Sequence, residues 1–181
     1  MSTAESAVVD TGKATFSAAV SALSVANAGT DFFTITGATG IVTKVLRIEV
    51  SGIATAAAAI PFTVVKRTTA NSAGTATNPS GVPHDNVQSM STAKSVVAAY
   101  TANPTTGSTS NGGGTIAAKR GTVLTAAAGT PASPTVFDFT GSGGKYPTLR
   151  SATDVIALNL GGGTFAGNAI DVQITWTEEA P

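Results

Sequence analysis

Hydrophobic and polar residues alternate most clearly toward the C-terminus of the chain, in the sequence NAIDVQITWTEE from Asn168 to Glu179. The large apolar residues occupy every second position, and they are Ile170, Val172, Ile174 and Trp176. A strand places residues with this period of two on one face, whereas a helix would spread them around its circumference at about 100° per residue. The pattern predicts a strand with one buried and one solvated face, which needs an opposing layer.

The same alternation predicts further strands. In residues 41–51 we expect Val42, Leu46, Ile48 and Val50 to face inward, with Lys44 on the apolar side and its ammonium reaching water. Residues 13–25 also alternate, although an alanine-rich run of this kind is compatible with a short helix. Additional strands are expected at 32–36, 62–67, 95–101, 115–125, 135–140, 146–150 and 154–160.

Glycine and proline refine three of these assignments. Pro61 is expected at the first residue of a strand or on a sheet edge, because proline donates no ladder hydrogen bond. Gly121 predicts a bulge or bend within 115–125. The glycine-rich run 161–167 separates the last two strands, which we expect to form an antiparallel pair.

Three segments lack any such period. Residues 1–14 are expected to form an N-terminal arm, and residues 68–94 a long loop rich in Asn, Ser, Gly, Thr and Pro. A second loop covers 105–114, and 126–134 is a connector. A structureless loop as long as 68–94 usually binds something or is ordered by a neighbour, so it is the first place to look for function.

These segments together predict an all-β fold of about eight to ten strands, without the helical crossovers that parallel sheets require. We expect a single-domain antiparallel β-sandwich over residues 15–181, following the arm 1–14. Jelly-roll topology is favoured, and other Greek-key connections remain open.

Composition narrows the classes of function. Ten Lys and Arg balance ten Asp and Glu, and charged residues make up only 11% of the 181 residues, so a nucleic-acid partner is not expected. Weak charge repulsion between copies favours a homo-oligomer. The chain has no cysteine, hence no disulfide. The first residues lack the pattern of a secretory signal, and the longest apolar stretch, Ala56 to Phe62, is too short for a membrane span.

The single histidine, His84, lies in the long loop beside Asp85. A hydrolytic triad would need a nucleophile against it, but Ser80, Ser89 and Ser91 do not lie in a nucleophile elbow. We interpret Asp85 as a turn cap and His84 as an exposed or locally bonded loop residue. One imidazole and scattered carboxylates, paired only at Glu178–Glu179, predict no metal site.

One glycine-rich motif has an ordinary structural interpretation. Gly141 to Lys145 resembles a phosphate-binding loop only superficially, because Phe139 and Tyr146 replace the glycine and hydroxyl that the motif requires. A turn is the better interpretation.

The basic pairs Lys66–Arg67 and Lys119–Arg120 each direct their two charges to opposite faces of a strand. They favour a solvated face or an inter-subunit ion pair over a nucleic-acid stripe. Trp176 could stack on a sugar, but its place in the alternation assigns it to the core. We therefore predict no catalytic, cofactor-binding or metal-binding residues and no enzymatic activity.

The order of several segments resembles that of tailed-bacteriophage virion structural proteins of β-sandwich type, which decorate or cement capsids. The segments are Val45–Gly52, Thr63–Thr75, Val82–Asp85, Ala99–Pro104, Leu149–Leu160 and Ile174–Glu179. The resemblance covers about Thr34 to Glu179 and includes no chemically diagnostic motif.

This resemblance implies a non-enzymatic protein on the outer capsid surface of the virion, made in the host cytoplasm. Its partners would be the major capsid protein and other copies of itself, commonly as a trimer, without a cofactor. We expect residues 1–14 and 68–94 to make most contacts with the capsid. A tail or head-fibre component and a carbohydrate-binding β-sandwich are the alternatives.

Overall fold

Twelve β-strands and no helix are found in the residues that the computed structural model describes, which are 13–25, 30–54, 56–85, 92–125, 133–141, 145–163 and 167–181. They are β1 (Lys13–Leu23), β2 (Asp31–Thr36), β3 (Val42–Ala54), β4 (Ala58–Arg67), β5 (Thr75–Thr77), β6 (Val82–Pro83), β7 (Val96–Ala102), β8 (Gly114–Thr125), β9 (Thr135–Asp138), β10 (Thr148–Leu149), β11 (Val155–Asn159) and β12 (Gly167–Glu179).

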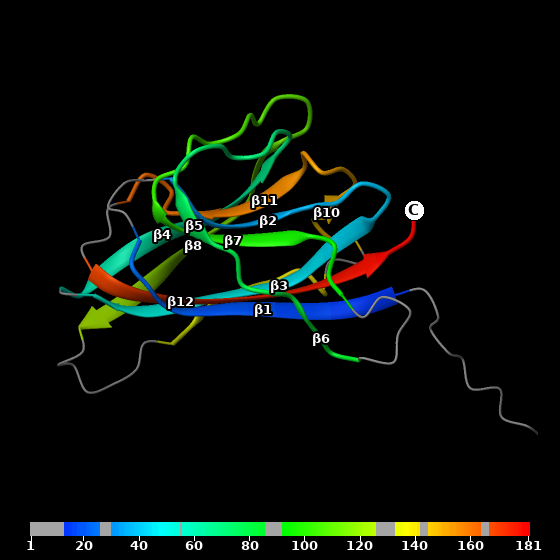
Figure 1. Ribbon diagram of the computed structural model, residues 1–181. Coiled ribbons are helices and arrows are strands. Elements are labelled where there is room, and N and C mark those ends of the chain that lie inside the picture. The colour runs from blue at the N-terminus through cyan, green and yellow to red at the C-terminus, as the bar shows by residue number, and fades with distance from the viewer. Residues whose placement is uncertain are drawn as a thin grey trace, which may run out of the picture.

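The strands form two packed layers, which Figure 1 shows one above the other. The β12 sheet has the order β6-β1-β12-β3, and β9 and β10 pair with the far side of β3. The β11 sheet has the order β5-β7-β2-β11-β4-β8. The end of β8 also pairs in parallel with the end of β3, and this contact joins the two sheets along one side. The predicted β-sandwich is confirmed, while the jelly-roll wiring stays a prediction.

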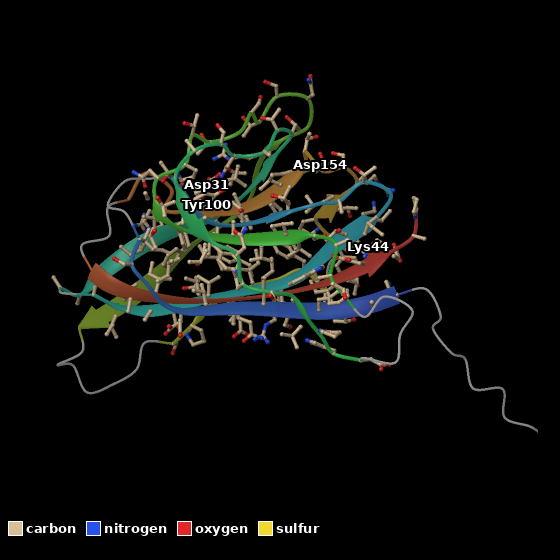
Figure 2. All side chains as sticks on the ribbon, viewed as in Figure 1. Asp31, Lys44, Tyr100 and Asp154 are labelled. Carbon is tan, nitrogen blue, oxygen red and sulfur yellow. The ribbon has the colours of Figure 1, made fainter. Side chains whose placement is uncertain are left out.

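Strand β12 is the central strand of its sheet, and its strict alternation predicts the face that is buried. It pairs antiparallel with β1 on one side and β3 on the other. All four of its large apolar side chains are buried, and the Trp176 ring stacks on Phe16 with centroids 5.7 Å apart. Within residues 13–25, Lys13–Leu23 form strand β1 rather than the alternative helix. Side chains from both layers fill the space between them in Figure 2.

Strand β3 corrects the prediction for residues 41–51. Thr175 of β12 pairs with Arg47, but Trp176 pairs with Val45, so Leu46 is an unpaired extra residue. This bulge shifts the alternation by one position, because side chains alternate with a period of two. Val45 is therefore fully buried and Leu46 only half-buried, the reverse of what was expected. Lys44 lies on the opposite face from Val45, where it forms an ion pair with Glu179.

The expected antiparallel pairing of the last two strands is wrong. Strand β11 pairs with β2 and β4 in one sheet, whereas β12 lies in the other. All five residues of β11 are buried, which requires cover on both faces and suits a central strand. The connection between them therefore crosses between layers, and it begins at Gly161 and Gly162, both with positive φ.

Pro61 meets the second of its two expectations, an edge position, whereas Gly121 differs from its prediction. Pro61 is the fourth residue of β4 and pairs with Arg120 of β8, but the β11 ladder on its other side begins only at Thr63. Pro61 is therefore locally on an edge, where a missing N–H costs no ladder bond. Pairing continues unbroken through Gly121, and the register shift in β8 lies at Ile116 instead.

Phe137 and Phe139, in the segment expected to form a strand over 135–140, are both buried. Several expectations concern residues outside the described ranges: the arm over 1–12, part of the long loop at 86–91, the connector at 126–132 and the turn at 142–144.

Candidate interaction surface

Residues 68–85, here called the belt, contain more structure than an aperiodic loop. Strand β5 pairs with β7 at the edge of the β11 sheet, and β6 pairs with β1 at the edge of the β12 sheet. The belt therefore crosses from one layer to the other along the side of the sandwich opposite β8. Most of its residues from Ala70 to Asp85 are exposed. The backbone of the belt is therefore held by strand pairing at both sheets, while most of its residues are exposed.

Gly81 fixes the belt against the core. A Cβ atom at Gly81 would lie 2.8 Å from Cζ2 of Trp176 and 2.6 Å from Cβ of Ala93. These distances are shorter than any normal carbon contact, so the backbone approaches the indole more closely than a side chain would allow. This contact explains why Trp176 is fully buried and confirms that it is a core residue.

His84 is bonded to β1 beyond the point where β6 ends. Its backbone N–H donates to the Thr15 carbonyl at 2.8 Å, and its Nε2 lies 2.7 Å from the Ser17 hydroxyl. Ser17 Oγ is also 3.1 Å from Thr175 Oγ1. His84 is exposed, which was one of the two interpretations, but its side-chain bond is not local, and sequence reasoning missed the partner. Ser17 is 67 positions away, and no local pattern marks the pair.

The Ser17–His84 pair differs from a hydrolytic site in the position of the backbone N–H of its serine. Ser17 lies between two paired strands, opposite Thr175 of β12 and Val82 of β6. Its backbone N–H therefore lies in the plane of the sheet and not above the hydroxyl, where an oxyanion would form. The contact fastens the belt to β1.

The first part of the belt, residues 68–74, also belongs to a second fixed region, here called the crest. The crest consists of residues 68–74 and 103–113 over the outer face of the β11 sheet, at the top of Figure 1. Beneath it, the fully buried Asp31 carboxylate binds Arg67 through two hydrogen bonds of 2.5 and 2.7 Å. Asn71 and Asn159 donate to the same carboxylate at 2.9 and 2.8 Å. Figure 2 labels Asp31 in the upper layer.

The Asp31 cluster joins both halves of the crest. Arg67 donates to the Gly107 carbonyl at 3.0 Å, and the Gly107 N–H donates to Asn71 Oδ1 at 2.8 Å. Ser72 and Thr105 exchange two backbone hydrogen bonds of 3.0 and 2.7 Å. Both loops are thus held against the sheet by buried, mutually satisfied polar groups, which rigidify a structure when complete. The crest also covers the apolar outer face of β11.

A second buried carboxylate, that of Glu178, fixes the chain just before β7. Its carboxylate accepts hydrogen bonds from the backbone N–H groups of Lys94 and Ser95, both at 2.8 Å, and from the Trp176 indole at 3.0 Å. The Ser95 hydroxyl lies 2.7 Å from that of Thr43. These bonds fix the entry into β7 against β12.

The basic pairs do direct their charges to opposite faces, but the partners differ from those expected. Arg67 is in the buried ion pair with Asp31 rather than on a solvated or inter-subunit face. Lys66 donates to the Thr148 carbonyl at 3.1 Å, and Lys119 donates to the Val136 carbonyl and lies over the Phe137 ring. Of the four cations in these pairs, only Arg120 is exposed without such a contact. The two pairs therefore do not form a basic stripe.

Metal-ligating side chains do not gather in the described part of the chain. Within it, no group of three or more His, Cys, Asp or Glu side chains is placed to bind a metal ion. No described helix has the length and apolarity needed to cross a bilayer. Large apolar residues are instead exposed on four strands: Val82 (62%), Val96 (51%), Ile53 (46%) and Ile116 (40%).

No known family model matches the chain, and no significant similarity connects it to a curated protein or a solved structure.

Proposed function

We propose that the protein is a non-enzymatic structural component of a bacteriophage virion that binds the outer capsid surface and stabilises it. The observation that carries the proposal is the belt, because it presents Val82, exposed by 62%, on a backbone anchored at both sheets. An ordered, exposed apolar side chain is the kind of feature that a protein partner buries.

The chemistry of the belt also supports a protein partner. From Thr68 to His84 it carries no charged residue, and its neighbour Val96 adds a second exposed apolar side chain. A surface of this type binds by shape complementarity and apolar burial. Because its backbone is fixed in advance by Gly81, His84 and the crest, little conformational entropy would be lost on binding.

On a capsid, the partner would be the major capsid protein, and many copies would bind across the lattice. The belt with residues 86–94, and the arm over 1–14, are proposed to supply most of these contacts. Residues 1–12 and 86–91 lie outside the described ranges, so the argument rests on 68–85. Association of the copies with one another, as a trimer, belongs to the same proposal.

The proposal is tested by binding the purified chain to capsids assembled from the major capsid protein encoded with it. We expect Val82→Asp to lower occupancy at least about tenfold, because a buried apolar contact of this size contributes roughly 1.5–3 kcal/mol. Ile53→Asp is the matched control, since Ile53 is also exposed but lies outside the belt, at the end of β3. Equal occupancy for both variants, or no binding of the wild-type chain, would refute the proposal.

A further inference from the structure

A slot opens between the two sheets on the side opposite the belt. Its lining comes from β8, from β4 and from the segment that joins β9 to β10, and it has a volume of about 560 Å³. The lining residues are Lys66, Ile116, Phe139, Lys145, Tyr146, Pro147 and Thr148. Because it lies where β8 diverges from the β12 sheet, the slot reaches side chains of the core: Phe139 is buried and Tyr146 packs against the buried cluster.

The walls of the slot are fixed by backbone hydrogen bonds. Phe139 donates to the Leu46 carbonyl at 2.9 Å, and Val45 donates to the Pro147 carbonyl at 3.0 Å. Thr148 Oγ1 donates to the Tyr146 carbonyl at 2.8 Å. The slot is therefore a preformed feature of the fold, of a size that suits a large side chain.

Its rim is basic. Lys66 extends from β4 across the mouth to the Thr148 carbonyl, and Lys145 is exposed beside Tyr146. None of the lining residues is acidic. A recess lined by both apolar and polar groups, with two ammonium groups at its rim, complements an apolar group that carries a negative charge next to it.

The unpaired edge of β8 lies beside the slot and indicates the direction in which a bound segment would run. Between Gly114 and Arg120, β8 pairs with β4 on one side, and no described strand pairs with its other side. The register shift at Ile116 leaves this side chain 40% exposed at the slot. An unpaired strand edge beside a pocket is the arrangement that binds extended peptides, since the edge offers backbone hydrogen bonds and the pocket selects a side chain.

We propose that this slot anchors an extended segment of a protein partner, taking one bulky apolar side chain while a neighbouring carboxylate pairs with Lys66 and Lys145. The inference deepens the proposed function by naming what the partner presents, and it rests on that function only for the identity of the partner. The chemistry applies to any extended acidic and aromatic segment.

The test uses a capped hexapeptide in which one phenylalanine is flanked by aspartates, and the same peptide with lysines in place of the aspartates. Binding to the full chain is followed by NMR through the methyl resonances of Ile116 and Val96. We expect the acidic peptide to shift Ile116 alone and to bind at least about fivefold more tightly than the basic one. Ile116→Glu should weaken its binding at least about tenfold, and Lys145→Glu about threefold.

Two controls are matched to these variants. Val96→Glu changes an exposed apolar residue on the other side of the sandwich, and Arg120→Glu reverses an exposed cation on β8 that does not line the slot. Both should leave peptide affinity unchanged.

Several results would overturn the slot proposal. They are no shift at millimolar acidic peptide, equal affinity for the two peptides, or an Ile116→Glu change that dissociates copies of the chain without affecting peptide binding. Because no capsid is present, failure here would leave the decoration proposal standing, and failure of capsid binding would leave the slot standing.

Discussion

Asp31 and Glu178 are both fully buried carboxylates, but their partners are of different kinds. Asp31, beneath the crest, is bonded to three side chains from separate segments, one of them a guanidinium. Glu178, beside the belt, is bonded to two backbone N–H groups and one indole. The crest is thus held by hydrogen bonds between several specific side chains. The entry into β7 is held instead by one carboxylate that accepts hydrogen bonds from the main chain.

The largest effect is expected from breaking the Asp31 ion pair. Arg67→Met should lower the free energy of unfolding by about 3–5 kcal/mol, because it leaves a buried carboxylate without its cation. Urea denaturation measures the loss. The double variant Asp31→Leu with Arg67→Met should be less destabilised than Arg67→Met alone, since it removes both charges. Additive losses would show that the two side chains do not act as a pair.

A smaller loss is expected at Glu178. Glu178→Gln should cost about 2–3 kcal/mol, because the amide NH₂ replaces one acceptor oxygen and leaves at least one buried N–H without a partner. The same urea experiment applies, and hydrogen exchange at the Ser95 amide should accelerate more than exchange in the crest. A loss below about 0.5 kcal/mol would contradict the role given to Glu178.

A substitution at Gly81 tests how closely the belt is held against Trp176. Gly81→Ala should cost about 1–3 kcal/mol, since its Cβ would overlap Trp176 and Ala93. Gly141→Ala is the matched control, because a Cβ there meets no atom within 4 Å. Thermal unfolding compares the two variants, and equal melting temperatures would mean that the belt is not pressed against the indole.

The smallest effect concerns Asp138, an exposed carboxylate that contrasts with the two buried ones. The hydroxyl and backbone N–H of Thr140 lower its pKa below the ordinary value of 3.8, with a further contribution from Arg47 and Lys119. The carboxylate therefore stabilises the fold above pH 3.8, and this contribution is lost as the pH falls through the lowered pKa. Thr140→Val should raise the pKa toward 3.8 in an NMR titration. An unchanged midpoint would contradict the assignment.

Alternation alone was enough to predict the sandwich and the buried face of β12, because this strand is buried on one face and solvated on the other. It failed in β3, where the bulge at Leu46 changes which face is buried without any sign in the sequence. It also placed β11 beside β12, because neighbours in sequence usually pair. Strand β11 is apolar on both faces, and that feature was the available signal for a central position in the other sheet.

The candidate surface was only partly accessible from sequence. Residues 68–94 stood out through their length and composition, and the belt lies within them. The partners of Asp31, His84 and Glu178 come from distant segments, so no local spacing indicates them. The slot depends in the same way on tertiary geometry, because β8, β4 and the β9–β10 segment meet only in the fold.

The most direct test of the account is the copy number of this chain in purified virus particles, measured by quantitative mass spectrometry together with antibody labelling of intact particles. Capsid decoration predicts many copies, in a fixed ratio to the major capsid protein and accessible on the outer surface. Absence from the particles, or a few copies confined to the tail or a single vertex, would contradict it.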